Sequence, residues 1–82
     1  MQTGQRELAY HIYLELMVEK TGKNEDELKA EIGLEAFEKQ VRQLHYQWMC
    51  GEFSFGKFTE IIGIPHWELW EILDALGLQI HR

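Results

Sequence analysis

Glycines divide this sequence into segments that each have the residue spacing of an α-helix. Glycine is the residue that most often ends a helix, and the sequence has only one proline. The pattern predicts an all-α fold, a small helical bundle of about five helices in one domain over residues 1–82. Its expected parts are an N-terminal helix (5–20), central helices (24–50) and a C-terminal helix-turn-helix-like pair (54–77).

The central helices carry the clearest local signals. Asn24 and Glu27 have the spacing of a capping box, and the helix that they begin is expected to end at Gly33. The next helix, 34–49, has apolar residues at alternating spacings of three and four, namely Leu34, Phe37, Val41, Leu44 and Trp48. This seam indicates packing of one helix on another, so we expect Phe37 and Trp48 to be buried.

Two short helices are expected in the C-terminal segment. Ser54 is placed to cap the first, 55–62, and Pro65 suits the first turn of the second, which extends to about Leu76. Gly63 lies between them. Two short helices joined by a glycine-containing turn are typical of a helix-turn-helix. The alternating tail, 78–80, could pair as a short strand.

The N-terminal helix has an unusually wide apolar surface. Its apolar residues cover an arc of about 200°, whereas one small core needs only about 100°. One interpretation is a subunit interface, in which a second copy covers the side made by Tyr10, Tyr13, Leu14 and Met17. The other is a central helix wrapped by the rest of the chain. We take the first as the prediction and expect a homodimer.

Composition limits the classes of protein that this chain can represent. Acidic residues outnumber basic ones 14 to 8, which argues against a general nucleic-acid binder. The single cysteine, Cys50, cannot form an internal disulfide, so a reducing, cytoplasmic location is expected. Neither a signal peptide nor an apolar stretch of the roughly 20 residues that span a bilayer is visible, so no membrane association is expected.

The residues that could perform chemistry do not form a recognisable active site. Ser54 is the only serine and is explained as a helix cap, while Cys50 is a lone thiol beside a helix end. His11 shares a helix face with Glu7 and Glu15, which could hold a metal ion, but a solvated polar stripe explains the same pattern. We therefore expect no enzyme activity, no cofactor and no metal site.

The order and spacing of residues from Ser54 onward resemble a known family. The matching positions are Ser54, Gly56, Lys57, Glu60, Gly63, Trp67, Glu68, Leu73, Gly77 and Ile80. The segment from about Asn24 to Ile80 resembles small, uncharacterised prokaryotic helix-turn-helix proteins regarded as candidate antitoxins. The resemblance implies a helix-turn-helix fold and a toxin–antitoxin or regulatory role. The chain departs from that family at its N-terminal helix, where family members begin with a short strand, and at Phe58-Thr59, where they have two alanines.

The charges expected on the last helix bear on whether its partner is DNA or a protein. A reading helix presents basic residues to phosphates, but the exposed arc here is expected to hold Trp67, Glu68, Glu71 and Asp74. Direct contact of this helix with nucleic acid is therefore not expected. Trp67 is either covered by another part of the chain or anchors a partner with a basic surface. We predict a non-enzymatic protein-interaction module, antitoxin-like or regulatory; the alternative is a helix-turn-helix transcriptional regulator.

Overall fold

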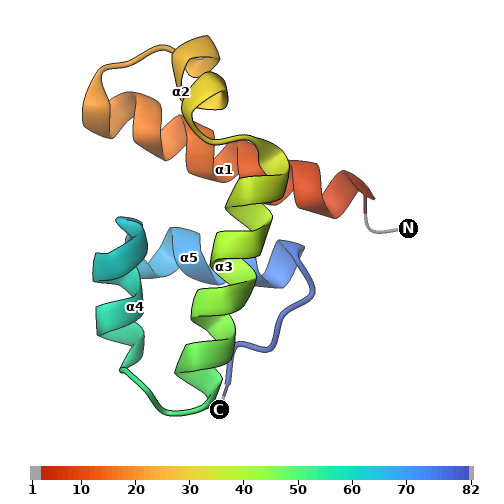
Figure 1. Cartoon of the computed structure of the whole chain (residues 1–82), viewed down its shortest axis with the longest axis vertical. Coiled ribbons are helices and arrows are strands. Elements are labelled where there is room, and N and C mark those ends of the chain that lie inside the picture. Colours follow the sequence, from red (N-terminus) through yellow and green to blue (C-terminus); the bar gives the residue numbers. More distant parts are fainter. Residues whose placement is uncertain (1–2, 82) are drawn as a thin grey trace.

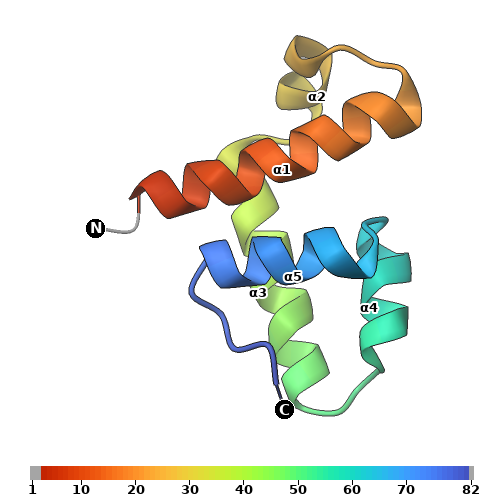
Figure 2. The same ribbon diagram turned by 180° about the vertical axis from the view of Figure 1, so that it is seen from behind.

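The computed structural model describes residues 3–81 and is helical throughout its regular elements, with no strand among those residues (Figures 1 and 2). The elements are α1 (Thr3–Thr21), α2 (Glu25–Glu31), α3 (Leu34–Met49), α4 (Phe55–Ile62) and α5 (His66–Ala75). The predicted all-α bundle is confirmed. The tail, 78–80, is irregular rather than a strand, since residues 3–81 contain no other strand to pair with it. The Gln79 carbonyl oxygen accepts from His45 Nε2 at 2.6 Å.

Helix α1 crosses the top of the molecule and contacts three other helices. Figure 1 shows α2 folded back on α1, α3 descending from it, and α4 beside α3; Figure 2 shows α5 running below α1. The contacts of α1 are with α5, α2 and α3, and those of α4 are with α3 and α5. The wide apolar surface of α1 is therefore covered largely by its own chain, as the second interpretation of its sequence expected.

The seam of α3 forms the centre of the core. Phe37 and Val41 are completely buried and Trp48 is 6% exposed, so the expectation for Phe37 and Trp48 is confirmed. Each of the other helices adds buried apolar residues, namely Ala9, Leu14 and Met17 from α1, Leu28 from α2, Phe58 and Ile62 from α4, and Leu69, Ile72, Leu73 and Ala75 from α5. Apolar burial on this scale is the main force that holds the helices together.

Helix ends are fixed by the caps that the sequence indicated. The Asn24 side chain accepts from the Glu27 backbone N–H at 2.9 Å, and the Glu27 carboxylate accepts from the Asn24 N–H at 3.1 Å. Ser54 Oγ accepts from the Lys57 N–H at 3.1 Å and caps α4. These bonds satisfy N–H groups that a helix start leaves unpaired.

Gly63 makes the turn from α4 into α5. Its φ of +77° lies in the left-handed region, which glycine adopts without the strain that a side chain would cause. Lys20, near the end of α1, donates from Nζ to the Gly63 carbonyl oxygen at 2.9 Å. The turn is thus tied to α1, and it places the first residues of α5 at the surface.

Candidate functional site

Helix α5 has a buried side and an exposed side. Leu69, Ile72 and Leu73 are completely buried, whereas Trp67, Trp70, Glu71 and Asp74 are exposed. The exposed four have spacings that place them in one line on a helix. We call these four residues the α5 face. The residue types and the spacing follow directly from the sequence, but their exposure depends on which side of α5 the rest of the chain covers.

Trp67 is the most exposed large apolar side chain among the described residues, at 72%, and Trp70 is 42% exposed. Their ring centroids are 6.1 Å apart and the rings are nearly perpendicular, at 89°. Edge-to-face contact of this kind is favourable and holds the two indoles in a fixed arrangement. Trp67 is therefore not covered by the described chain, which resolves the alternative that its sequence position left open.

Phe55 connects the exposed pair to the core. Its ring centroid lies 6.1 Å from that of Trp70 and 5.0 Å from that of Trp48, and the His66 ring lies 5.2 Å away. The contact with Phe55 covers part of the Trp70 ring. Its 42% exposure, however, makes Trp70 part of the surface that sequence reasoning missed.

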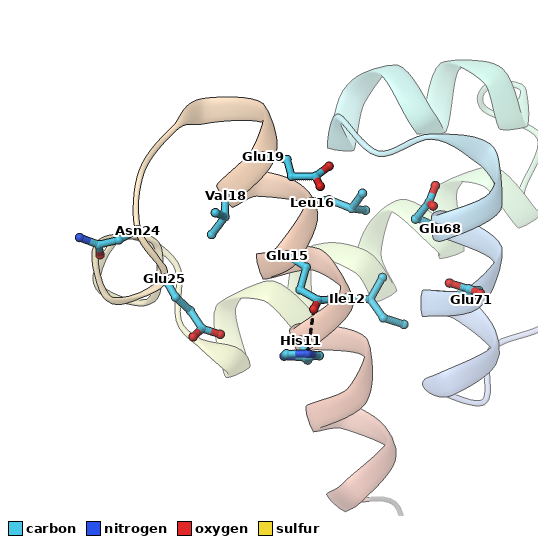
Figure 3. Close-up of a pocket in the computed structure, with 10 residues that line it drawn as sticks. All are labelled: His11, Ile12, Glu15, Leu16, Val18, Glu19, Asn24, Glu25, Glu68 and Glu71. Atoms are coloured by element: carbon cyan, nitrogen blue, oxygen red, sulfur yellow. Dashed lines mark ion pairs between the residues drawn. The ribbon is translucent and has the colours of Figure 1, made fainter.

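An acidic groove of about 690 Å³ lies beside the α5 face (Figure 3). Glu68 and Glu71 of α5 line it across from Ile12 and Leu16 of α1, and Glu15 lies on the same side of the groove as α1, paired with His11. Glu68 is half-buried, unlike the exposed position expected for it. The groove is lined by His11, Ile12, Glu15, Leu16, Val18, Glu19, Asn24, Glu25, Glu68 and Glu71, with no lysine or arginine among them. The groove thus gathers carboxylates of α1, α2 and α5, of which Glu15 lies 3.3 Å from His11 Nε2 through its Oε2.

Some carboxylates elsewhere in the molecule, those of Glu31, Glu38 and Glu60, have cationic partners. Glu38 Oε1 accepts from Arg6 Nε at 2.6 Å and its Oε2 lies 2.9 Å from Arg42 Nη2. Partial burial acts to raise the pKa of Glu38, but the hydrogen bonds and charges of the two arginines outweigh it and lower that pKa below its ordinary value. Within residues 3–81, no such partner reaches the side chains of Glu71 or Asp74.

The structure corrects the predicted dimer surface on α1. Leu14 is 1% exposed and Met17 is 9% exposed, so both are packed inside the chain and have almost no surface for a second copy; the expectation is wrong for these two residues. Tyr10 and Tyr13 are half-buried, with rings 5.6 Å and 4.7 Å from that of Phe37. The Tyr10 hydroxyl also donates to the Ile32 carbonyl at 2.8 Å.

The remaining candidates for chemistry have ordinary surroundings. Ser54 acts as a helix cap, Cys50 is a free, exposed thiol, and His11 Nε2 lies 3.3 Å from Glu15 Oε2 on the exposed side of α1. In the described part of the chain, no group of three histidine, cysteine or acidic side chains is arranged to hold a metal ion. Within the same part, no helix has the length and apolar character needed to cross a bilayer.

Comparisons with protein-family models, curated proteins and solved structures returned no match to this chain. The resemblance to candidate antitoxins therefore stays a prediction based on the residues of the C-terminal segment. The α5 face is the surface feature that bears most directly on function.

Proposed function

We propose that this chain is a protein-binding module whose α5 face contacts another protein. The observation that carries the proposal is the exposure of Trp67, 72%, next to a second indole held perpendicular to it. Tryptophan is among the residues that contribute most to protein interfaces, because covering a large rigid ring removes much apolar surface from water at little cost in side-chain entropy.

The charge around the tryptophans favours a partner with a basic surface. Glu71 and Asp74 share the α5 face, and Glu68 lies in the adjoining groove with Glu15 and Glu19. The groove residues include one histidine, His11, and no lysine or arginine. Complementary charge speeds the encounter of two proteins and disfavours acidic competitors.

The same charges weigh against DNA as the ligand of α5. A recognition helix needs basic side chains near its exposed residues, because neutralising phosphates supplies much of the affinity. The α5 face has two carboxylates and no basic residue. On α4, the charge of Lys57 is offset by Glu60, whose Oε1 lies 3.7 Å from Lys57 Nζ. The proposal is therefore a protein-binding role for a fold with helix-turn-helix spacing.

The family resemblance gives the proposal a specific form. In that form the chain is an antitoxin-like protein, its partner is a toxin with a basic substrate-binding surface, and both act in the cytoplasm, where Cys50 stays reduced. Association of the chain with itself, through surfaces of α1 other than Leu14 and Met17, is a further part of the proposal. Leu8, 53% exposed, lies on that helix.

Site-specific photo-crosslinking in living cells tests the protein-binding role. A benzophenone amino acid in place of Asp74 lies on the α5 face, and the same amino acid in place of Tyr46, 68% exposed on α3, is the matched control. We expect a discrete crosslinked protein from position 74 that is lost when Trp67→Ala is added and is absent from position 46. A Trp67→Ala loss of about 2 kcal/mol in binding, roughly thirtyfold, is typical of such an anchor.

Results of three kinds would contradict the proposal. One is a crosslink from position 74 to nucleic acid, which would revive the transcriptional regulator. Another is the same protein crosslinked from both positions, or a crosslink that survives Trp67→Ala. The third is no crosslink at position 74 in cells that contain the folded chain.

A further inference from the structure

We infer that the residue of the partner that anchors on the α5 face is an arginine. Its guanidinium stacks on the Trp67 indole and its N–H groups pair with the Glu71 carboxylate. This inference rests on the proposed function, because it specifies the chemistry of a partner that must first bind the α5 face. It adds a selectivity that neither exposed apolar surface nor negative charge alone would give.

The relative position of Trp67 and Glu71 matches the two parts of an arginine side chain. The two residues are four apart on α5, so their side chains are neighbours on one face of the helix. Trp67 is 72% exposed and its edge-to-face contact with Trp70 takes up only part of its ring, so the rest of the ring is open to solvent. A planar cation stacked on the Trp67 ring extends past the edge of that ring. There its N–H groups can reach the Glu71 carboxylate.

Arginine fits this pair better than lysine. The guanidinium is planar and weakly hydrated, and it can stack on an indole while it presents two parallel N–H groups to a carboxylate. A lysine ammonium is compact and strongly hydrated, so it has neither a flat face to stack on an indole nor a parallel pair of N–H groups that matches a carboxylate. Stacking of a cation on an exposed tryptophan contributes about 0.5–1 kcal/mol, which corresponds to a factor of roughly two to five in affinity.

The carboxylate is available for such a partner. Across residues 3–81, no lysine, arginine or histidine pairs with Glu71, whereas Glu38 is held by Arg6 and Arg42. The groove beyond Glu71 contains Glu68, Glu15 and Glu19, so a segment with further basic residues finds more negative charge in the same direction. The α5 face thus has an aromatic anchor position and an acidic continuation.

A second copy of this chain is not the occupant that the charges favour. Arg6 and Arg42, the arginines among residues 3–81, are already engaged with Glu38, and using either as the anchor would remove one of the two cations that hold this partly buried carboxylate. Contact between two α5 faces would bring Glu71 and Asp74 of both copies together, which like-charge repulsion opposes. An arginine-bearing segment of a different protein meets neither obstacle.

The test uses the intact chain and three helical peptides of alanine and leucine without tryptophan. They are identical except that arginine, lysine or the neutral arginine analogue citrulline occupies the same positions. Binding is followed through the indole N–H signal of Trp67 in the nuclear magnetic resonance spectrum of the isotope-labelled protein. We expect the arginine peptide to shift this signal with an affinity about threefold to fivefold above that of the lysine peptide, and citrulline to cause no shift.

Variants of the chain separate the anchor from general negative charge. Glu71→Gln should lower the affinity for the arginine peptide about fivefold and reduce its advantage over lysine, because one arm of the pair is lost. Glu35→Gln removes an exposed carboxylate of α3 and should leave both affinities unchanged. Equal affinities for arginine and lysine, or no shift of the Trp67 signal with the arginine peptide, would overturn the inference.

Failure of this inference is distinguishable from failure of the proposed function. If the peptides are not discriminated but crosslinking at position 74 still depends on Trp67, the partner binds the α5 face through another residue. If the peptide result is negative and the crosslink is also absent, the proposed function fails as well. A concentration-dependent shift of the Trp67 signal without peptide, together with a dimer in light scattering that Trp67→Ala abolishes, would assign the α5 face to a second copy and contradict the inference.

Discussion

Trp48 and Trp67 are the same residue type in opposite situations. Trp48, on α3, is 6% exposed, and its ring centroid lies 5.0 Å from that of Phe55 and 6.1 Å from that of Phe58. Trp67, on α5, is 72% exposed, and its ring contact is with another surface tryptophan. The first belongs to the seam that assembles the bundle, and the second belongs to a line that also contains two carboxylates.

The difference shows that the exposed tryptophans are not needed to complete the core. The buried side of α5 already has Leu69, Ile72 and Leu73 at zero exposure, and the seam of α3 is filled by Phe37 and Val41. Apolar surface that folding leaves uncovered remains available to a partner. The predictions below test this separation between a region that folds the chain and a region that binds.

The largest expected effect comes from exchanging the two tryptophans for alanine in turn. Trp48→Ala should cost about 3–5 kcal/mol, because it leaves a large cavity in the core, and that approaches the whole stability of a domain of this size. Trp67→Ala should change stability by less than about 0.5 kcal/mol. Chemical denaturation followed by circular dichroism measures both.

Cooperative, native-like unfolding of Trp48→Ala would break the comparison, since it would place the α3 seam outside the core. A loss of structure in Trp67→Ala would also contradict the comparison, because it would mean that Trp67 is needed for folding. In that case its loss of crosslinking would report misfolding rather than a binding contact, and the proposed function would lose its main variant.

The turn between α4 and α5 gives the next largest effect. Gly63→Ala should destabilise the fold by about 1–2 kcal/mol, because a side chain at φ +77° is strained. Gly56→Ala is the control: it lies inside α4, where an added Cβ meets only Ser54 Oγ at an ordinary 3.7 Å. That change should stabilise by about 0.5–1 kcal/mol through helix propensity. In thermal unfolding, Gly63→Ala should lower the melting temperature and Gly56→Ala should raise it.

Among residues 3–81, Glu38 is paired with cations and Glu71 is not, which allows the same comparison for charged residues. Glu38→Gln should cost about 1 kcal/mol at neutral pH, because Arg6 and Arg42 lose their partner. The folded-state pKa of Glu38 is lowered, so the stability that it contributes is fully present above its unfolded pKa of about 4.3. It is lost as the pH falls through the lower folded value. The gap between wild type and variant should therefore close on acidification, and a constant gap would contradict the pairing.

The smallest effect is expected at Glu71. Because Glu71 and Glu68 enter one groove with Glu15, Glu71→Gln should stabilise the fold slightly, by up to about 0.5 kcal/mol at low salt. Added salt should remove the gain, since it screens the repulsion. Destabilisation by this variant, at any salt concentration, would mean that Glu71 has a structural role, and its use as a binding variant would then fail.

Local features of the fold could be predicted from the sequence because they involve neighbouring residues. The capping box needs only Asn24 and Glu27, three positions apart, and both of its hydrogen bonds form. The start of α4 needs only Ser54 and the N–H group of Lys57. The α3 seam is similar, since its spacing fixes which side of the helix turns inward whatever it packs against.

The partners of α1 and the edges of α5 depend on the tertiary arrangement. The apolar arc of α1 correctly indicated that more than one neighbour covers it, but spacing alone does not tell α5 from a second copy, and Leu14 and Met17 pack inside the chain. On α5, Trp70 and Glu68 lie at the boundary between buried and exposed sides. Phe55 beneath Trp70 and α1 beside Glu68 decide how far each is covered.

The aromatic contacts from Trp48 through Phe55 and Trp70 to Trp67 have a consequence for how this protein can evolve. Constraint decreases outward: Trp48 is 6% exposed, Trp70 is 42% and Trp67 is 72%. Substitutions at position 67 or 71 change what the surface offers while the bundle keeps its stability. If the α5 face binds a partner as proposed, substitutions at these two positions can change that partner without unfolding the bundle.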